Sequence, residues 1–192
     1  MSLVQRHKVL AFFGVTGEST TVYHRMKKFT QLAMSKNPIE YNRQYVDEPF
    51  QENDIVGYSP SIAYAFDRHT NDPVQADIIS ITDGELLGDD AVRTIITVDT
   101  SATPAVAYKR EYTVIPSSEG DNINVYTYSG TPKVKGEKVK GTATSSDDWQ
   151  TVTFSEDEGE VNGDAPEADV AALSGVPEDH EIQEYEQSDE TE

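Results

Sequence analysis

The stretch Val106-Ala-Tyr-Lys-Arg-Glu-Tyr-Thr-Val114 decides the fold class of this chain. Its large side chains recur at every second position, and successive side chains of an extended strand point to opposite faces. β-Branched and aromatic residues at that spacing are typical of half-buried antiparallel strands. The stretch is the longest alternating set in the chain and predicts a strand; the set comprises Val106, Tyr108, Arg110, Tyr112 and Val114.

The same period of two recurs on both sides of this stretch. Turn residues, Asn37-Pro38 and Ser59-Pro60, precede two of the alternating sets, as expected where a strand begins. We predict the longer strands from Tyr41, Arg43 and Tyr45; from Ile62, Tyr64 and Phe66; and from Val92, Thr94, Ile96 and Val98, with Ile95 on the opposite face. We predict shorter strands at 123–128, 133–135, 139–144 and 151–154, a loop at 116–121, and turns at Ser129-Gly130 and Asp147-Asp148.

Residues 20–34 fit either a β-hairpin arm or a helix, and their Thr, Val, Tyr and Phe content favours strand. One segment, about 72–82, predicts a helix. Asn71 or Asp72 suits the N-cap, and Pro73 suits the first helical position. Val74, Ile78 and Ile81 follow at helical spacing before Asp83-Gly84 ends the segment. The expected fold is therefore mainly β: an antiparallel β-sandwich or barrel with one flanking α-helix.

Composition divides the chain into two parts. Of the 17 aromatic residues only Tyr185 lies beyond Phe154, so residues 1–154 hold the material for a core, with an extended N-terminal arm. Residues 155–192 contain 15 acidic and no basic residues, which accounts for −15 of the formal charge of −20 and leaves −5 for the body. High like charge with few apolar residues favours disorder, so we expect 155–192 to be an acidic, disordered extension.

The charge and the missing cysteines exclude several functions. Phosphate neutralisation needs clustered Lys and Arg, so an acidic chain is a poor binder of nucleic acid or of anionic membranes. The absence of Cys removes disulfides, thiolate metal sites and Cys nucleophiles. The longest apolar run, Val9 to Val15, is too short to span a bilayer, and the N-terminus lacks a secretory pattern, so we expect cytosolic synthesis.

We find no convincing catalytic, cofactor-binding or metal-binding residues. The four histidines, His7, His24, His69 and His180, lie far apart and lack ligand spacing. The acidic cluster from Asp83 to Asp90 is better explained as a solvated loop than as a Ca²⁺ site. Gly136 and Gly141 lack the Lys-Ser/Thr of a phosphate loop. We predict no enzyme activity and no cofactor.

Three stretches resemble phage major tail tube proteins, in particular those of long-tailed phages of Gram-positive bacteria. The stretches are 29–48, with Ser35-Lys-Asn-Pro38 and Tyr41-Asn-Arg-Gln-Tyr-Val-Asp-Glu48; 57–68, beginning Gly57-Tyr-Ser-Pro60; and 126–154, with Tyr126-Thr-Tyr-Ser-Gly130, Lys140-Gly-Thr-Ala-Thr144 and Trp149 to Phe154. They are ordinary residues in a matching order and cover roughly 20–154. The acidic extension lies outside the resemblance.

The resemblance implies a structural virion protein located in the tail and assembled in the host cytoplasm. Six copies would form a ring, and stacked rings would form a hollow tube that conducts DNA without binding it. Implied partners are the chain itself and, in addition, the tape measure, tail terminator and baseplate-side proteins, with no membrane partner. The family has no active site, so no catalytic residues carry over.

Two other interpretations compete with a tube subunit. Tyr-rich strands and Trp149 also suit a monomeric β-sandwich binding module, such as an adhesin or a carbohydrate-binding domain. The carboxylates from Asp83 to Asp90 suit, less well, an acid–base enzyme. Met26-Lys-Lys28 and the lysines between Lys133 and Lys140 suit either DNA contact or pairing with acidic residues of a neighbouring copy.

Overall fold

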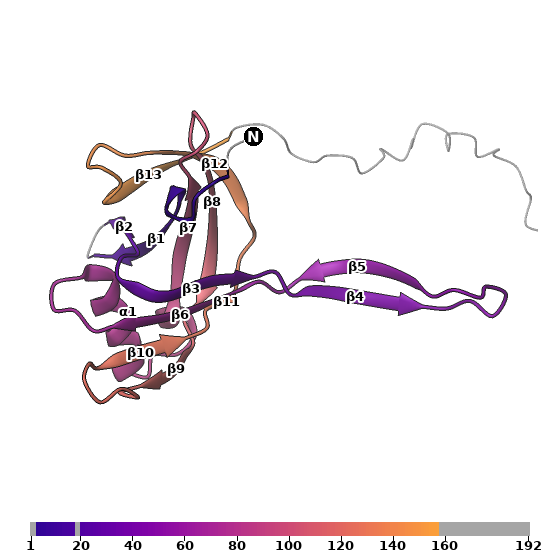
Figure 1. The fold of residues 1–192 in the computed structure, drawn as a ribbon, viewed down its shortest axis with the longest axis horizontal. Helices are drawn as coiled ribbons and strands as arrows, with labels where there is room; N and C mark the ends of the chain where they lie inside the picture. Colours follow the sequence, from indigo (N-terminus) through magenta and orange to yellow (C-terminus); the bar gives the residue numbers. More distant parts are fainter. Residues whose placement is uncertain (1–2, 18–19, 158–192) are drawn as a thin grey trace, which may run out of the picture. The chain divides into compact units, whose positions relative to one another are not determined.

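A computed structural model describes residues 3–17 and 20–157 (Figure 1). The acidic extension predicted from 155 onward lies, from residue 158, outside the described residues. The described chain is mainly β. Its strands are β1 (Val9–Thr16), β2 (Thr21–Arg25), β3 (Phe29–Ser35), β4 (Pro38–Arg43), β5 (Glu52–Tyr58), β6 (Ser61–Asp67), β7 (Val92–Asp99), β8 (Val106–Thr113), β9 (Pro116–Glu119), β10 (Thr127–Gly130), β11 (Lys133–Val134), β12 (Val139–Thr144) and β13 (Thr151–Glu156).

Six of these strands close into an antiparallel barrel. The order is β12-β13-β2-β1-β7-β8, and β8 pairs with β12 to complete the circle. All six strands supply side chains to the interior, as expected where inward and outward positions alternate. The interior contains Leu10, Phe12, Tyr23, Ile96, Val98, Ala107, Ala143, Val152, Trp149 and Phe154.

A second antiparallel sheet covers part of the outer face of the barrel. Its order is β3-β6-β10-β9, and the short β11 links β6 to β8. Ile62, Tyr64 and Phe66 alternate along β6 and are buried, as the spacing predicts. They pack with the outward-facing Phe13, Ile95, Tyr112 and Val114 of the barrel region and with Tyr128 of β10.

The single α-helix, α1 (Pro73–Asp83), closes this second core. The Asp72 carboxylate accepts hydrogen bonds from Val74 N at 3.0 Å and Gln75 N at 3.2 Å, which satisfies two N–H groups of the first turn. Val74, Ile78 and Ile81 are buried. The predicted helix, its cap and its buried face are confirmed. Two 3₁₀ turns, η1 (Arg6–Lys8) and η2 (Gly88–Ala91), complete the regular elements.

Strands β4 and β5 form a separate two-stranded sheet. Figure 1 shows this hairpin continuing from β3 and β6 away from the barrel. We refer to residues 37–59 as the arm. Its register pairs Pro38 with Tyr58 and Arg43 with Glu52, with a bulge at Ile39/Glu40.

Four local predictions are wrong. The strand predicted from Tyr41, Arg43 and Tyr45 is β4, which begins at Pro38 and ends at Arg43, so Tyr45 lies outside it. Residues 116–121 contain β9 instead of only a loop, and Ser129-Gly130 belongs to β10 instead of a turn. The strand predicted at 123–128 begins only at Thr127. Ile123 is 101% exposed, so its apolar side chain has no face to pack against. Pro116 is tolerated in β9 because an edge strand needs no donor on its open side. Residues 20–34 are strand, but β2 pairs with β1 and β13 and β3 pairs with β6, so they form no hairpin.

Candidate assembly surfaces

The arm carries apolar side chains that are exposed to solvent in the single subunit. Val46 and Phe50 at its tip are 108% and 79% exposed. Along the strands Ile39, Tyr41, Ile55, Val56 and Tyr58 are also exposed. An isolated two-stranded hairpin is marginally stable in water, and contiguous exposed apolar surface marks an interaction site.

Arg43 organises the middle of the arm. Its guanidinium forms salt bridges of 2.9 Å with Glu52 and 2.5 Å with Asp54 across the strand pair. It also lies 5.9 Å from the Tyr41 ring centroid and 5.8 Å from that of Tyr45. The hydrogen bond that Arg43 donates to the Asp54 carboxylate raises the pKa of Arg43. These contacts leave the acidic residues nearer the tip, Asp47 and Glu48, outside the network.

The β3-β6-β10-β9 sheet has two open edges. β3 pairs with β6 alone and β9 pairs with β10 alone among the described residues. Each pair in the sheet is antiparallel, so β3 and β9 run in opposite directions. The β9 edge of one copy therefore suits antiparallel pairing with the β3 edge of another, which is how a sheet closes without exposed edges.

The face of this sheet that points away from the barrel carries small, mostly uncharged side chains. In one row across the sheet, Gln31 pairs with Ala65, Ala65 with Ser129, and Ser129 with Ser118. The Ser118 and Ser129 hydroxyls are 2.8 Å apart. Ala33, Ser35, Ser61, Ala63, Asp67 and Thr127 complete the face. Asp67 is the charged residue in this set.

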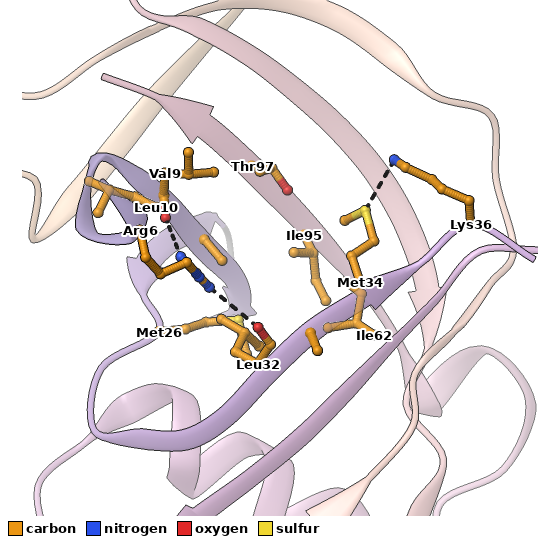
Figure 2. A pocket seen from close by; sticks show the side chains of 12 residues that line it. Arg6, Val9, Leu10, Met26, Leu32, Met34, Lys36, Ile62, Ile95 and Thr97 are labelled. Carbon is orange, nitrogen blue, oxygen red and sulfur yellow. Dashed lines mark hydrogen bonds between the residues drawn. The ribbon is translucent and has the colours of Figure 1, made fainter. Parts of the chain in front are cut away.

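A groove lies beside the open edge of β3, on the part of the outer barrel face that the second sheet leaves uncovered. Figure 2 shows Leu32, Met34, Ile62 and Ile95 lining it between Arg6 and Lys36. Two cavities, of about 480 and 460 Å³, share Met34, Lys36, Ile95 and Thr97 and so form one continuous groove. We call it the basic groove. Its further lining includes Val9, Ala11, Tyr58, Tyr108, Arg110, Tyr112 and Lys138.

Several Lys and Arg side chains line the basic groove, and the described lining residues include no Asp or Glu. The ammonium group of Lys138 lies 3.6 Å from the Tyr108 ring centroid. Burial, together with the neighbouring Lys36 and Arg110, lowers the pKa of Lys138. Arg110 Nε donates to Gly136 O at 2.8 Å, and Lys36 lies 3.5 Å from the Met34 sulfur. Within the described chain neither these three cations nor Arg6 forms a salt bridge.

The residues considered for chemistry from the sequence do not converge. Asp89 pairs with Lys135, and Tyr128 Oη donates to Asp83 at 3.5 Å. Over residues 3–17 and 20–157, no group of three or more His, Asp or Glu side chains is arranged to hold a metal ion. His69 Nδ1 lies 2.7 Å from Asp67 O, so it takes part in a local turn.

Trp149 packs inside one end of the barrel, with its ring centroid 6.4 Å from that of Phe12. The preceding Asp147 carboxylate accepts hydrogen bonds from Thr151 and Ser145, which lower the pKa of Asp147. Trp149 is therefore half-buried against the end of the barrel core, and it also lines an adjoining cavity of about 670 Å³. No helix in the described part of the chain is long and apolar enough to cross a membrane.

Comparison with known proteins relates this fold to tail structures. No family model and no curated protein matches the sequence. A chain in the tail of an empty GTA particle, obtained by helical refinement with C6 symmetry, aligns with a TM-score of 0.54 and 11% identity, covering 70% of this chain and 96% of that chain. A chain in the six-fold symmetrised baseplate of the anti-feeding prophage aligns with a TM-score of 0.47 and 9% identity, covering 73% and 96%.

The first of these likenesses supports a shared fold. It agrees with the resemblance drawn from the sequence at the level of a tail-type β fold. A Gram-positive host and a long-tailed phage remain predictions.

Proposed function

We propose that this chain is a non-enzymatic structural subunit that assembles into stacked hexameric rings and forms a hollow phage tail tube. The observation that carries the proposal is the β3-β6-β10-β9 sheet, whose two open edges run in opposite directions. Six copies joined β9 to β3 form one continuous antiparallel sheet around a central lumen. The C6-symmetric tail that contains a chain of similar fold supports this number of copies.

The small-residue face of the same sheet suits the lumen wall. Its rows of Ala, Ser and Thr offer DNA neither a basic surface to hold phosphate nor large side chains to obstruct passage. Bound counterions are released only where Lys or Arg neutralise phosphates, so such a wall gives little salt-dependent retention. In this proposal DNA passes through the lumen and is not bound.

The tube subunit works in the virion tail, after assembly in the host cytoplasm. Its main partner is itself. Proteins that set the length of the tube, cap it and start it at the baseplate complete the partner set implied by the sequence resemblance. No cofactor, metal or membrane takes part.

Removing one backbone N–H from β9 tests whether this strand is the edge that closes the ring. Gly120 N donates to Thr127 O across the β9–β10 pair at 2.9 Å, so by alternation the N–H of Glu119 points to the open edge. Glu119→Pro removes that donor, whereas Glu119→Ala removes the carboxylate and keeps the donor. In sedimentation velocity, we expect Glu119→Ala to assemble and Glu119→Pro to stay monomeric with unchanged circular dichroism. Equal assembly of both variants contradicts β9 as the closing edge.

A further inference from the structure

We propose that the basic groove is the receptor for the acidic, apolar arm tip of a second copy of this chain. The inference rests on the proposed tube function and adds to it the contact that joins successive copies. The occupant is the tip segment 44–51, Gln-Tyr-Val-Asp-Glu-Pro-Phe-Gln.

The groove fits an occupant with both apolar and anionic groups. Its lining combines the apolar side chains of Met34, Ile95 and Tyr112 with the cations Lys36 and Lys138, without an acidic residue among the described lining. The positive charges of Lys36, Arg110 and Lys138 repel one another in the free subunit. An incoming carboxylate would relieve that repulsion.

The arm tip has the complementary character. Val46 and Phe50 are the apolar groups, and Asp47 and Glu48 carry two negative charges that no salt bridge within the described residues uses. Burying Phe50 in an apolar groove would remove a large, exposed apolar side chain from water.

A subunit cannot place its own tip in its own groove. Tyr58 and Lys36, at the base of the arm, are part of the groove lining. The paired strands β4 and β5 hold the tip away from that base, since Arg43 lies five residues beyond Pro38 on β4, about 17 Å at about 3.3 Å per residue, and the tip follows beyond Arg43. The tip of one copy therefore meets the groove of another, displaced by about one arm length. Such a head-to-tail contact propagates instead of closing on itself, as the stacking of rings requires.

The chain contains no cysteine, so introduced thiols report this contact directly. We would mix full-length Val46→Cys with full-length Thr97→Cys, because Thr97 lines both cavities of the groove. Thr153→Cys, exposed on β13 outside the groove, is the matched control. Oxidation followed by non-reducing electrophoresis should give a dimer from Val46→Cys with Thr97→Cys and little from either variant alone or from Val46→Cys with Thr153→Cys.

Charge exchange tests the same contact in the same assay. Lys138→Glu in the groove partner should lower the cross-linking yield several-fold, and Glu48→Lys in the tip partner should restore it. Micrographs of each mixture separate the two proposals. Tubes with no more cross-linking at Thr97→Cys than at Thr153→Cys overturn the groove contact and leave the tube. Cross-links without rings or tubes support the contact and contradict the tube. If neither cross-links nor tubes form, both proposals are contradicted.

Discussion

The side-chain amide of Asn37 donates to the carbonyl oxygen of Ser59 at 3.0 Å and so ties together the two strands where the arm leaves the body. The same amide lies 3.1 Å from the Ser61 hydroxyl, and Ser59 N donates back to Asn37 O at 3.0 Å. Asn37 has φ of 43°, in the left-handed region that Asn tolerates better than most residues. The Asn37 side chain thus supplies two of the three hydrogen bonds described at the base of the arm.

Asn37→Ala should free the arm and leave the body folded. The change removes two hydrogen bonds and places alanine at an unfavourable φ, yet none of the buried core contacts is lost. We expect faster chymotryptic cleavage at Tyr41 and Tyr45, slower assembly, and a midpoint of thermal unfolding within a few degrees of the parent. Asn42→Ala, in the middle of β4, is the control. Equal cleavage of the two variants would show that Asn37 does not hold the arm.

Gly141 is the glycine on which barrel closure depends. It pairs with Ala107 of β8 and Glu156 of β13, and a Cβ at this position would collide with the Ser155 carbonyl and lie 2.6 Å from the Phe154 ring. Gly141→Ala should therefore reduce the free energy of unfolding by about 3 kcal/mol, measured in urea. Gly57→Ala in the arm, whose Cβ would lie 3.6 Å from Ile39, should change it by less than about 0.5 kcal/mol. Similar losses for both would contradict the barrel closure described above.

Tyr64 makes stability depend on alkaline pH. Burial raises the pKa of Tyr64 to about 12, against about 10 in an unfolded chain. The folded state favours the neutral phenol, so this contribution is complete below pH ~10 and is lost as the pH rises toward ~12, at up to about 1.4 kcal/mol per pH unit. Tyr64→Phe should lose stability less steeply than the parent over that range in urea titrations. Identical slopes for the parent and Tyr64→Phe would mean that Tyr64 ionises as readily in the folded protein as in the unfolded chain.

The acidic extension should slow assembly. Residues 158–192 contain 13 acidic and no basic residues, and like charges on approaching subunits oppose association. We propose that the extension keeps subunits soluble before polymerisation. The cut belongs after Asp157, because β13 continues to Glu156 and Asp157 lies 3.7 Å from Lys140. Light scattering should show faster growth for the truncated chain at low salt and a smaller difference at high salt. Unchanged growth at low salt removes the idea.

The local elements were largely predictable because they depend on neighbouring residues. Alternation over Ile62 to Phe66 and the cap–proline pair Asp72-Pro73 specify a strand and a helix without tertiary information. β9 and β10 were misassigned because Ser117, Ser118 and Gly130 have weak strand preferences and are held in the sheet by pairing alone. The run from Val9 to Val15 has no alternation, because β1 is buried on both faces: Phe12 faces the barrel interior and Phe13 faces the second core.

The assembly surfaces were beyond a reading of the sequence because they join distant residues. Closure of the barrel requires β8 to pair with β12, whose first residues Val106 and Val139 are 33 positions apart, and so to complete a circle of six strands. The basic groove brings Lys36, Arg110 and Lys138 together, and no local pattern links those three positions. The sequence predicts an extended N-terminal arm, and in the structure the exposed arm is residues 37–59, whose strands β4 and β5 pair with each other.

Negative-stain electron microscopy of the purified full-length chain across a range of concentrations shows whether the chain forms a tube. We expect tube assembly, seen as hollow rings at moderate concentration, tubes of uniform width at high concentration, and six-fold symmetry in end-on views. Small monodisperse particles at every concentration, from both the full-length chain and the chain ending at Asp157, would contradict it.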